Sequence, residues 1–123
     1  MRDEAGEWRR FAAEDMLAAE VLLETPGLSR LAVFLCHEAI EKALKAIWVE
    51  RHGTAPQRTH NLLHLVATLE LEMEDERLAF LRTLHALLVP SRYPNPFDLP
   101  QERARYYVQE ARGLFEWLQR LMS

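Results

Sequence analysis

The chain has 123 residues, of which 49% are hydrophobic and 28% charged, and its formal net charge is -4. This length suits one domain spanning residues 1–123, and the composition is that of a soluble globular protein. The acidic balance argues against a chain-wide basic surface for duplex DNA or RNA, so any nucleotide site must be local. No apolar run approaches the roughly 20 residues that a membrane span needs.

The N-terminal sequence and the cysteine content indicate a compartment. The first ten residues, "MRDEAGEWRR", carry charges of both signs and lack the apolar region of a signal peptide. Cys36 is the single cysteine and cannot form an internal disulfide. We therefore expect a cytoplasmic protein.

The first predicted helix covers residues 7–24 and ends at the "TPG" turn that follows. Its apolar residues form one stripe at helical spacing: Trp8, Phe11, Ala12, Ala19, Leu22 and Leu23. Asp15 projects from the middle of this stripe. A carboxylate there needs a cation, for which Lys42, Lys45 and Arg92 are the favoured partners, unless Asp15 reaches water at the edge of the stripe.

The second predicted helix runs from Ser29, as its N-cap, to about His52, and Gly53 provides a left-handed C-terminal cap. Its apolar arc covers about half the circumference, so we expect it to lie centrally in the fold. The opposite arc gathers polar residues: His37, Glu38, Glu41, Lys42 and Lys45. Two Glu-to-Lys pairs at i,i+4, Glu38 with Lys42 and Glu41 with Lys45, would stabilise an arc that is exposed to solvent. Alternatively, the two lysines are phosphate ligands beside aromatic surface.

Three further helices follow in the sequence. One begins near Thr59, one covers residues 75–88, and the last covers residues 101–121. The last helix has an apolar stripe made of Ala104, Tyr107, Val108, Ala111, Leu114, Phe115 and Leu118. No segment alternates like a strand, so the sequence predicts an all-α fold, an up-and-down bundle of four or five helices.

The stretch "LVPSRYPNPFDLP", residues 88–100, is the most proline-dense part of the chain. Its prolines remove backbone donors and restrict their neighbours to extended conformations, which predicts a rigid crossing between the last two helices. Such a loop would preorganise Arg92 and Tyr93 to meet a phosphate or a carboxylate. Alternatively, Arg92 ties the loop to the bundle through an internal salt bridge.

The usual catalytic and metal-binding motifs are missing. His60 and His64 have the spacing of two ligands on one helix face, but no third ligand accompanies them. Cys36 lies on an apolar arc, no serine stands in a nucleophile elbow, and there is no glycine-rich phosphate loop. We therefore expect neither a metal nor a cofactor.

Four stretches in order resemble the HEPN domain family: "FLCHEAIEKALKAIWVERHG", "RTHNLLHLV", "SRYP" and "ARYYVQEARGLFEWL". The most specific parts are residues 41–46, the helix start at residues 60–63, and Arg92 to Pro94. This resemblance covers nearly the whole chain. It implies a four- or five-helix bundle that usually dimerises and, in many members, a partnership with a minimal nucleotidyltransferase in a toxin–antitoxin pair.

Many members of that family are ribonucleases that use an arginine followed, after four to six residues, by a histidine. The histidine would act as a general acid or base and the arginine would stabilise the phosphorane charge, without a metal. After Arg92, the corresponding positions hold Phe97, Asp98 and Leu99. Arg30 with His37 and Arg58 with His64 have similar spacings, but they stand elsewhere in the chain. The sequence therefore favours a non-catalytic module that binds a nucleotide or a nucleotidyltransferase, and the alternative is an RNA-cleaving toxin with a displaced Arg/His pair.

Two sets of candidate residues result from these patterns. The expected polar or nucleotide-binding site comprises Asp15, His37, Glu38, Lys42, Lys45, His60, Arg92 and Tyr93, with Lys42, Lys45 and Arg92 converging in space. Aromatic residues outside the main apolar stripes, and a glycine between two of them, suggest a homodimer interface made from the second or fifth helix. The candidates for it are Phe34, Trp48, Tyr106, Gly113 and Trp117.

Overall fold

A computed structural model describes residues 1–88 and 99–122 of the chain, and these residues form five α-helices. The helices are α1 (Asp3–Leu23), α2 (Ser29–His52), α3 (Leu62–Thr68), α4 (Asp75–Leu88) and α5 (Gln101–Leu121). The predicted all-α helical bundle is confirmed. None of the five helices has both the length and the apolar composition that crossing a membrane requires.

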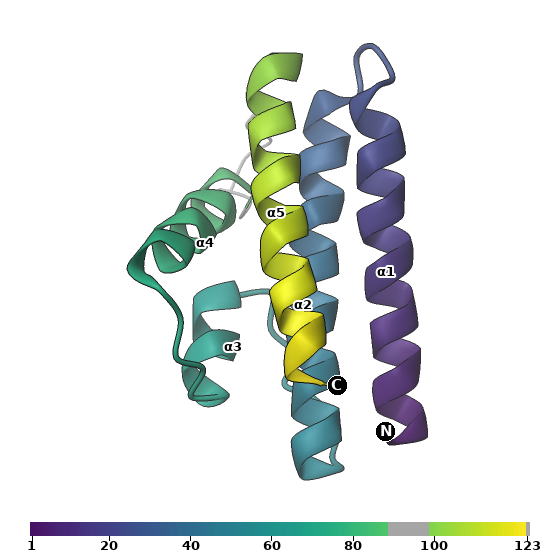
Figure 1. The fold of residues 1–123 in the computed structure, drawn as a ribbon, viewed down its shortest axis with the longest axis vertical. Coiled ribbons are helices and arrows are strands. Elements are labelled where there is room, and N and C mark those ends of the chain that lie inside the picture. The colour runs from purple at the N-terminus through teal and green to yellow at the C-terminus, as the bar shows by residue number, and fades with distance from the viewer. Residues whose placement is uncertain (89–98, 123) are drawn as a thin grey trace.

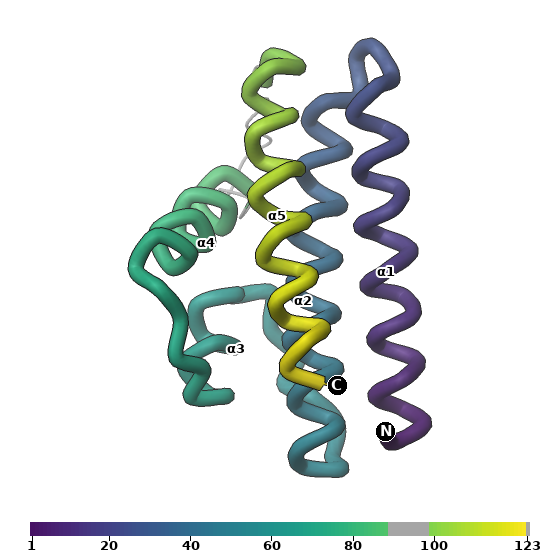
Figure 2. The backbone as a smooth tube through the Cα atoms, in the orientation of Figure 1, coloured from purple at the N-terminus to yellow at the C-terminus, as the bar shows by residue number. Residues whose placement is uncertain are grey.

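The three long helices lie side by side, and α2 is central (Figure 1). α1 and α2 run antiparallel, whereas α5 packs beside α2 and runs in the same direction as α2 (Figures 1 and 2). The shorter α3 and α4 lie on the side away from α1 (Figure 1). α2 contacts each of the four other helices, which confirms the central position that its wide apolar arc predicts.

The buried face of α5 is the one that the sequence predicts. All seven residues of its stripe are buried: Ala104, Tyr107, Val108, Ala111, Leu114, Phe115 and Leu118. Fully buried side chains of the neighbouring helices, such as Met16 of α1 and Leu44 of α2, belong to the same core. Cys36 is also buried there, in the packing role that the sequence predicts. The apolar periodicity of α5 therefore identifies its inner face correctly.

The buried face of α1 differs from the prediction. The buried residues are Ala5, Ala12, Met16, Ala19 and Leu23. Phe11, which was expected in the stripe, is 43% exposed, and the guanidinium of Arg10 lies 4.7 Å from the centre of its ring. Small residues on this face let the backbone of α1 approach α2 closely, whereas the phenylalanine ring is too large for that seam.

The ends of α2 bear out one prediction and contradict another. Gly53 has φ 68°, and its N–H donates to the carbonyl oxygen of Val49 at 2.8 Å, so it is the predicted left-handed cap. Ser29 is not the N-cap. Leu28 takes that place without a side-chain cap bond, and Ser29 is already helical.

The start of α3 is three residues later than predicted. Asn61 is its N-cap, and its side-chain oxygen accepts the N–H of His64 at 3.1 Å. The hydroxyl of Thr59 accepts the N–H of Asn61 at 3.1 Å, a local bond that competes with helix formation. The prediction of a helix from Thr59 is therefore wrong, and His60 precedes α3.

Polar contacts tie α5 to the end of α1. The guanidinium of Arg112 donates to both carboxylate oxygens of Glu20, and Arg105 pairs with Glu24 at 2.8 Å. The Gln101 amide donates to the carbonyl oxygen of Leu23 at 2.9 Å, which satisfies an acceptor at the end of α1. These contacts lie between α1 and α5, whereas the candidate site lies on the side of α2 that faces α3 and α4.

Candidate functional site

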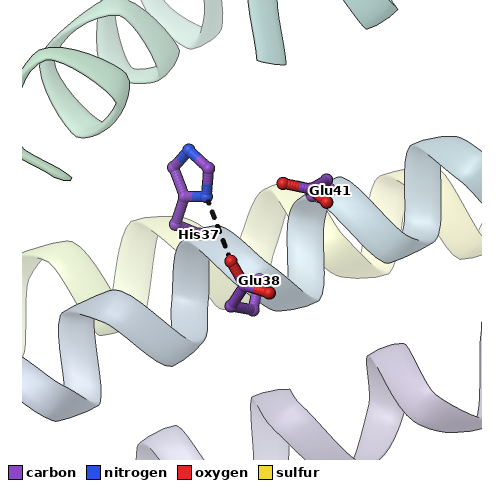
Figure 3. A group of neighbouring side chains, drawn as sticks. All are labelled: His37, Glu38 and Glu41. Carbon is purple, nitrogen blue, oxygen red and sulfur yellow. Dashed lines mark ion pairs between the residues drawn. The ribbon is translucent and has the colours of Figure 1, made fainter. Parts of the chain in front are cut away.

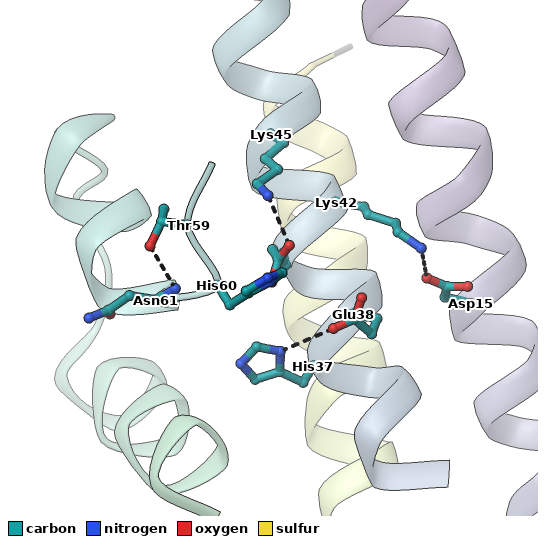
Figure 4. Close-up of polar contacts among 9 residues, drawn as sticks. Asp15, His37, Glu38, Lys42, Lys45, Thr59, His60 and Asn61 are labelled. Atoms are coloured by element: carbon teal, nitrogen blue, oxygen red, sulfur yellow. Dashed lines mark hydrogen bonds and ion pairs between the residues drawn. The ribbon is translucent and has the colours of Figure 1, made fainter. Parts of the chain in front are cut away.

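Asp15 and Lys42 link α1 to α2 at one edge of the candidate site. The ammonium of Lys42 donates to a carboxylate oxygen of Asp15 at 2.5 Å, and both side chains are about three-quarters buried. Figure 4 shows Lys42 reaching across to α1. The expectation that Asp15 meets a cation is confirmed for Lys42. The predicted Glu38–Lys42 pair is wrong, because the lysine is turned to α1 instead.

A buried ionic cluster on α2 stands beside this pair. Glu41 accepts from Lys45 at 2.9 Å with one carboxylate oxygen and contacts Nδ1 of His60 at 2.9 Å with the other. The side chains of Glu41 and Lys45 are only 5% and 8% exposed. The ring of Trp8 lies 5.7 Å from the Lys45 nitrogen and completes its surroundings.

The interpretation of this arc of α2 as a charged surface exposed to solvent is therefore wrong at three positions, because His37, Glu41 and Lys45 are buried. A helical wheel places them opposite the main apolar arc. However, a central helix is covered on several sides, and contacts from α1, α3 and α4 remove water from this face. The i,i+4 pair of Glu41 with Lys45 forms as predicted, but in the interior.

His37 is a buried imidazole without a hydrogen bond from the described residues. Its Nδ1 is 3.9 Å from a carboxylate oxygen of Glu38, beyond hydrogen-bond length, and its Nε2 has no partner in residues 1–88 or 99–122. The ring of His85, from α4, stacks on it with ring centres 6.1 Å apart. Burial lowers the pKa of His37 to about 4; Glu41 opposes this shift, and His85 and His60 add to it. His37 is therefore neutral at pH 7.

Glu38 lies next to His37 and is partly buried. Burial raises the pKa of its carboxyl group above the ordinary value, and the nearby Glu41 carboxylate adds to this rise, whereas Lys42 opposes it. Among residues 1–88 and 99–122, the one basic nitrogen within 4 Å of Glu38 belongs to the neutral His37. Within the described part of the chain, this carboxylate therefore has no cationic partner at ion-pair distance.

A cleft of about 600 Å³ opens between this face of α2, the end of α4 and the segment that precedes α3. Its wall is predominantly apolar with a few polar groups, which is typical of small-molecule sites. The lining residues are Phe34, His37, Glu38, His60, Asn61, His85 and Leu88. The structure thus brings together three of the predicted site residues, His37, Glu38 and His60, around one cavity.

Sequence analysis missed two polar residues of this cleft, Asn61 and His85. Asn61 has a local signal, because it is a good N-cap residue before an apolar run. His85 has none, since only the packing of α4 across α2 brings its ring onto His37. Its Nδ1 is buried and unpartnered within the part of the chain that the structure describes.

The thiol and the two lysines near this site are not activated nucleophiles. Burial raises the pKa of the Cys36 thiol to about 12, so the thiolate is not formed near neutral pH. Lys42 and Lys45 each hold a carboxylate partner. Arg92 and Tyr93 fall outside the described residues, and their convergence with the two lysines stays a prediction.

The five candidates for a dimer interface have different environments. Phe34 and Tyr106 are 40% and 55% exposed, and Gly113 is exposed with no heavy atom within 4 Å of an added Cβ. Trp48 and Trp117 are half-buried against the core, and the guanidinium of Arg77 lies 5.3 Å from the ring centre of Trp117. Trp117 is thus not the fully exposed anchor that its helical position predicted.

Comparisons with known proteins extend over the whole fold. The family model of the HEPN domain matches residues 5–121. No functionally curated protein matches the chain by sequence. The crystal structure of TT1696 from Thermus thermophilus is similar with a TM-score of 0.81 and 20% identity, over 97% of this chain and 98% of that one. ST0689, an archaeal HEPN homologue, is similar with a TM-score of 0.75 and 22% identity, over 100% of both chains. At these identities the two likenesses concern the fold.

Proposed function

This chain belongs to the HEPN domain family, and we propose that it acts in that family as a non-catalytic module that binds a nucleotide. The observation that carries the proposal is the cleft beside α2. Its volume of about 600 Å³ suits a small molecule, and its wall combines flat rings with a few hydrogen-bonding groups. The rings of Phe34 and His85 offer stacking surface for a base, and Asn61 offers both a donor and an acceptor for its edge.

Phosphate recognition would come from Lys42, which lies on the α1 side of α2 outside the cleft lining, and from Arg92. Lys42 is 27% exposed and could exchange Asp15 for a phosphate oxygen, whereas the more buried Lys45 remains with Glu41. Arg92 is the second proposed phosphate ligand, because a guanidinium binds phosphate with two parallel hydrogen bonds. The family resemblance adds a partner class: a minimal nucleotidyltransferase, in a two-gene toxin–antitoxin arrangement.

Nucleotide binding is tested by replacing the proposed phosphate ligand. Arg92→Ala should weaken the binding of ATP, GTP, CTP or UTP, whichever binds best, by about 10- to 100-fold, as expected for loss of a charge-assisted bond worth roughly 1.5 to 3 kcal/mol. Isothermal titration calorimetry measures the change. Arg82→Ala removes an exposed guanidinium of α4 outside the cleft lining and serves as the matched control. Equal affinities of the two variants, or no binding of any nucleotide by the unchanged protein, would contradict the proposal.

One contact favours the second candidate function, a metal-independent endoribonuclease, although its histidine is His60 and not the one in the Arg30–His37 or Arg58–His64 pair. The Nδ1 of His60 contacts the Glu41 carboxylate at 2.9 Å, and the His60 side chain is 81% exposed. A carboxylate that orients an accessible imidazole in this way is an arrangement used for general bases. Incubating the protein with RNA in chelator separates the functions, because the binding module leaves the RNA intact, whereas the ribonuclease cleaves it and loses activity on His60→Gln.

We also propose that the chain forms a homodimer through exposed residues of α2 and α5, as the family resemblance implies. Phe34 and Tyr106 are large exposed apolar side chains, and Gly113 would permit close approach of a second helix. Light scattering at micromolar concentration should give a mass near twice the 14.4 kDa of one chain. Tyr106→Lys should shift the mass toward the monomer, whereas Leu17→Lys, at an exposed position of α1, should not. A mass of one chain that does not change on concentration would contradict dimerisation.

A further inference from the structure

Three side chains of α2 carry ligand atoms that converge on one point. One nitrogen of His37 and one carboxylate oxygen each of Glu38 and Glu41 all lie within 4.8 Å of one another. The helix produces this arrangement, because residues i and i+4 share a face and residue i+1 flanks it. Figure 3 shows the ring of His37 with the two carboxylates beside it, all on the same helix.

The separations are close to those of ligands around one metal ion. Two atoms bound at about 2.1 Å with a tetrahedral angle are roughly 3.4 Å apart, and trans ligands of an octahedral ion are roughly 4.2 Å apart. His37 Nδ1 and the Glu38 oxygen are 3.9 Å apart. Small rotations of the side chains would therefore bring all three atoms to one ion, without movement of the helix.

His37 provides an independent indication of a ligand. Its side chain is 6% exposed, and it makes no hydrogen bond to any residue in 1–88 or 99–122. The Nδ1 of this ring faces the Glu38 carboxylate at 3.9 Å, and an imidazole nitrogen that carries no hydrogen is a common metal ligand. Among the described residues Nδ1 has no hydrogen-bond partner, and a cation bound there would give this nitrogen a partner.

The local charge also favours a cation. Lys45 compensates Glu41, and Lys42 is turned away to Asp15 on α1 (Figure 4). Glu38 has no comparable partner among the described residues, and it stands beside a second carboxylate. A divalent ion between the two carboxylates would remove their mutual repulsion and supply the missing positive charge.

We infer that His37, Glu38 and Glu41 bind one first-row divalent transition metal ion of the Zn²⁺ type, with water completing its coordination. The imidazole nitrogen selects such an ion over Mg²⁺ and Ca²⁺, which prefer all-oxygen sites. This ligand set differs from the spacing of His60 and His64, from which no metal site was expected, and the fold places His60 against Glu41. In this position the His60 imidazole would orient the Glu41 carboxylate toward the metal ion. This inference is independent of the proposed nucleotide binding.

The test titrates ZnCl₂ into chelator-treated protein that carries no histidine tag, using isothermal titration calorimetry, with CoCl₂ as a visible-absorption probe of the coordination sphere. We expect one ion per chain and no competition from excess Mg²⁺. Glu38→Gln and His37→Gln should each weaken binding by at least about tenfold and abolish the cobalt absorption. Glu38 lies at the edge of the site, so its variant keeps the test valid if His37→Gln fails to fold.

Two matched controls remove a histidine and a glutamate elsewhere: His64→Gln and Glu72→Gln, both at exposed positions. Each should bind Zn²⁺ within about twofold of the unchanged protein, because surface substitutions away from a site have small effects. The inference is overturned if Zn²⁺ shows no saturable binding, if the Glu38 and His37 variants bind as the unchanged protein does, or if His64→Gln loses the site.

Discussion

Replacing Glu41 by alanine should lower the free energy of unfolding by about 3 to 5 kcal/mol, the range measured when one partner of a buried ion pair is removed. The physical reason is Lys45. Its ammonium bonds to Glu41 at 2.9 Å, and its side chain is 8% exposed, so the substitution leaves a buried charge without its carboxylate. His60 loses its contact with Glu41 as well. Urea denaturation in the presence of chelator measures the change.

Two comparisons establish that burial of the charge causes this loss. Glu7→Ala breaks an exposed pair with Arg10 and should cost less than about 1 kcal/mol. Replacing both buried partners, Glu41→Leu with Lys45→Met, should recover most of the stability, because no charge is then left unpaired. A Glu41→Ala variant as stable as Glu7→Ala would show that Lys45 finds water or another acceptor.

The second large effect is a loss of stability on mild acidification, caused by His37. Its pKa is lowered from 6.5 to about 4 in the folded protein, so between these values the unfolded chain binds the proton more tightly. The contribution of His37 to the free energy of unfolding is complete above its pKa in the unfolded chain. It is lost as the pH falls toward its pKa in the folded protein. On lowering the pH from 7.5 to 5, the free energy of unfolding falls by about 2 kcal/mol because of His37.

Other ionisable side chains surround His37, so the change must be measured as a difference between the unchanged protein and a variant. Glu38 and Glu41 flank it on α2, His85 faces it from α4, and His60 lies before α3. Glu38 acts in the opposite direction: its pKa is raised, so its contribution to stability is present at low pH and is lost as the pH rises.

The unfolding free energy of the unchanged protein and of His37→Gln should therefore be compared at pH 7.5 and pH 5, in chelator. Between pH 7.5 and pH 5, the unfolding free energy of His37→Gln should fall by about 2 kcal/mol less than that of the unchanged protein. The His64→Gln variant, at an exposed histidine, should show the same pH dependence as the unchanged protein. Parallel pH dependences of the His37 variant and the unchanged protein would show that the imidazole reaches water in the folded state.

The elements that the sequence predicts well are those with a local cause. α4 and α5 begin and end where predicted, because apolar periodicity and helix-breaking prolines act within a few residues. Gly53 ends α2 because a left-handed cap favours a residue without Cβ. The start of α3 was missed although its cause is also local, since the Asn61 cap was overlooked.

The candidate site could be predicted only in part. Asp15 within an apolar stripe signals a buried carboxylate that needs a cation, and Lys42 provides it. The unpartnered ring of His37 gives no such signal, because its burial depends on α4, whose His85 stacks on it from 48 positions further along the chain. The sequence also cannot reveal the cleft, since residues of α2, α4 and the segment before α3 line it together.

Four properties of this protein can be predicted from the amino-acid sequence: its all-α bundle, the positions of most of its helices, the buried face of α5, and its membership of the HEPN family. These properties follow from side-chain periodicity, from capping, and from motifs that are contiguous in the chain. Three others depend on how the helices pack: which polar residues of α2 are buried, how Lys42 and Lys45 are paired, and where the cleft opens. A helical wheel ranks the faces of one helix by polarity, whereas burial depends on how many neighbouring helices cover each face.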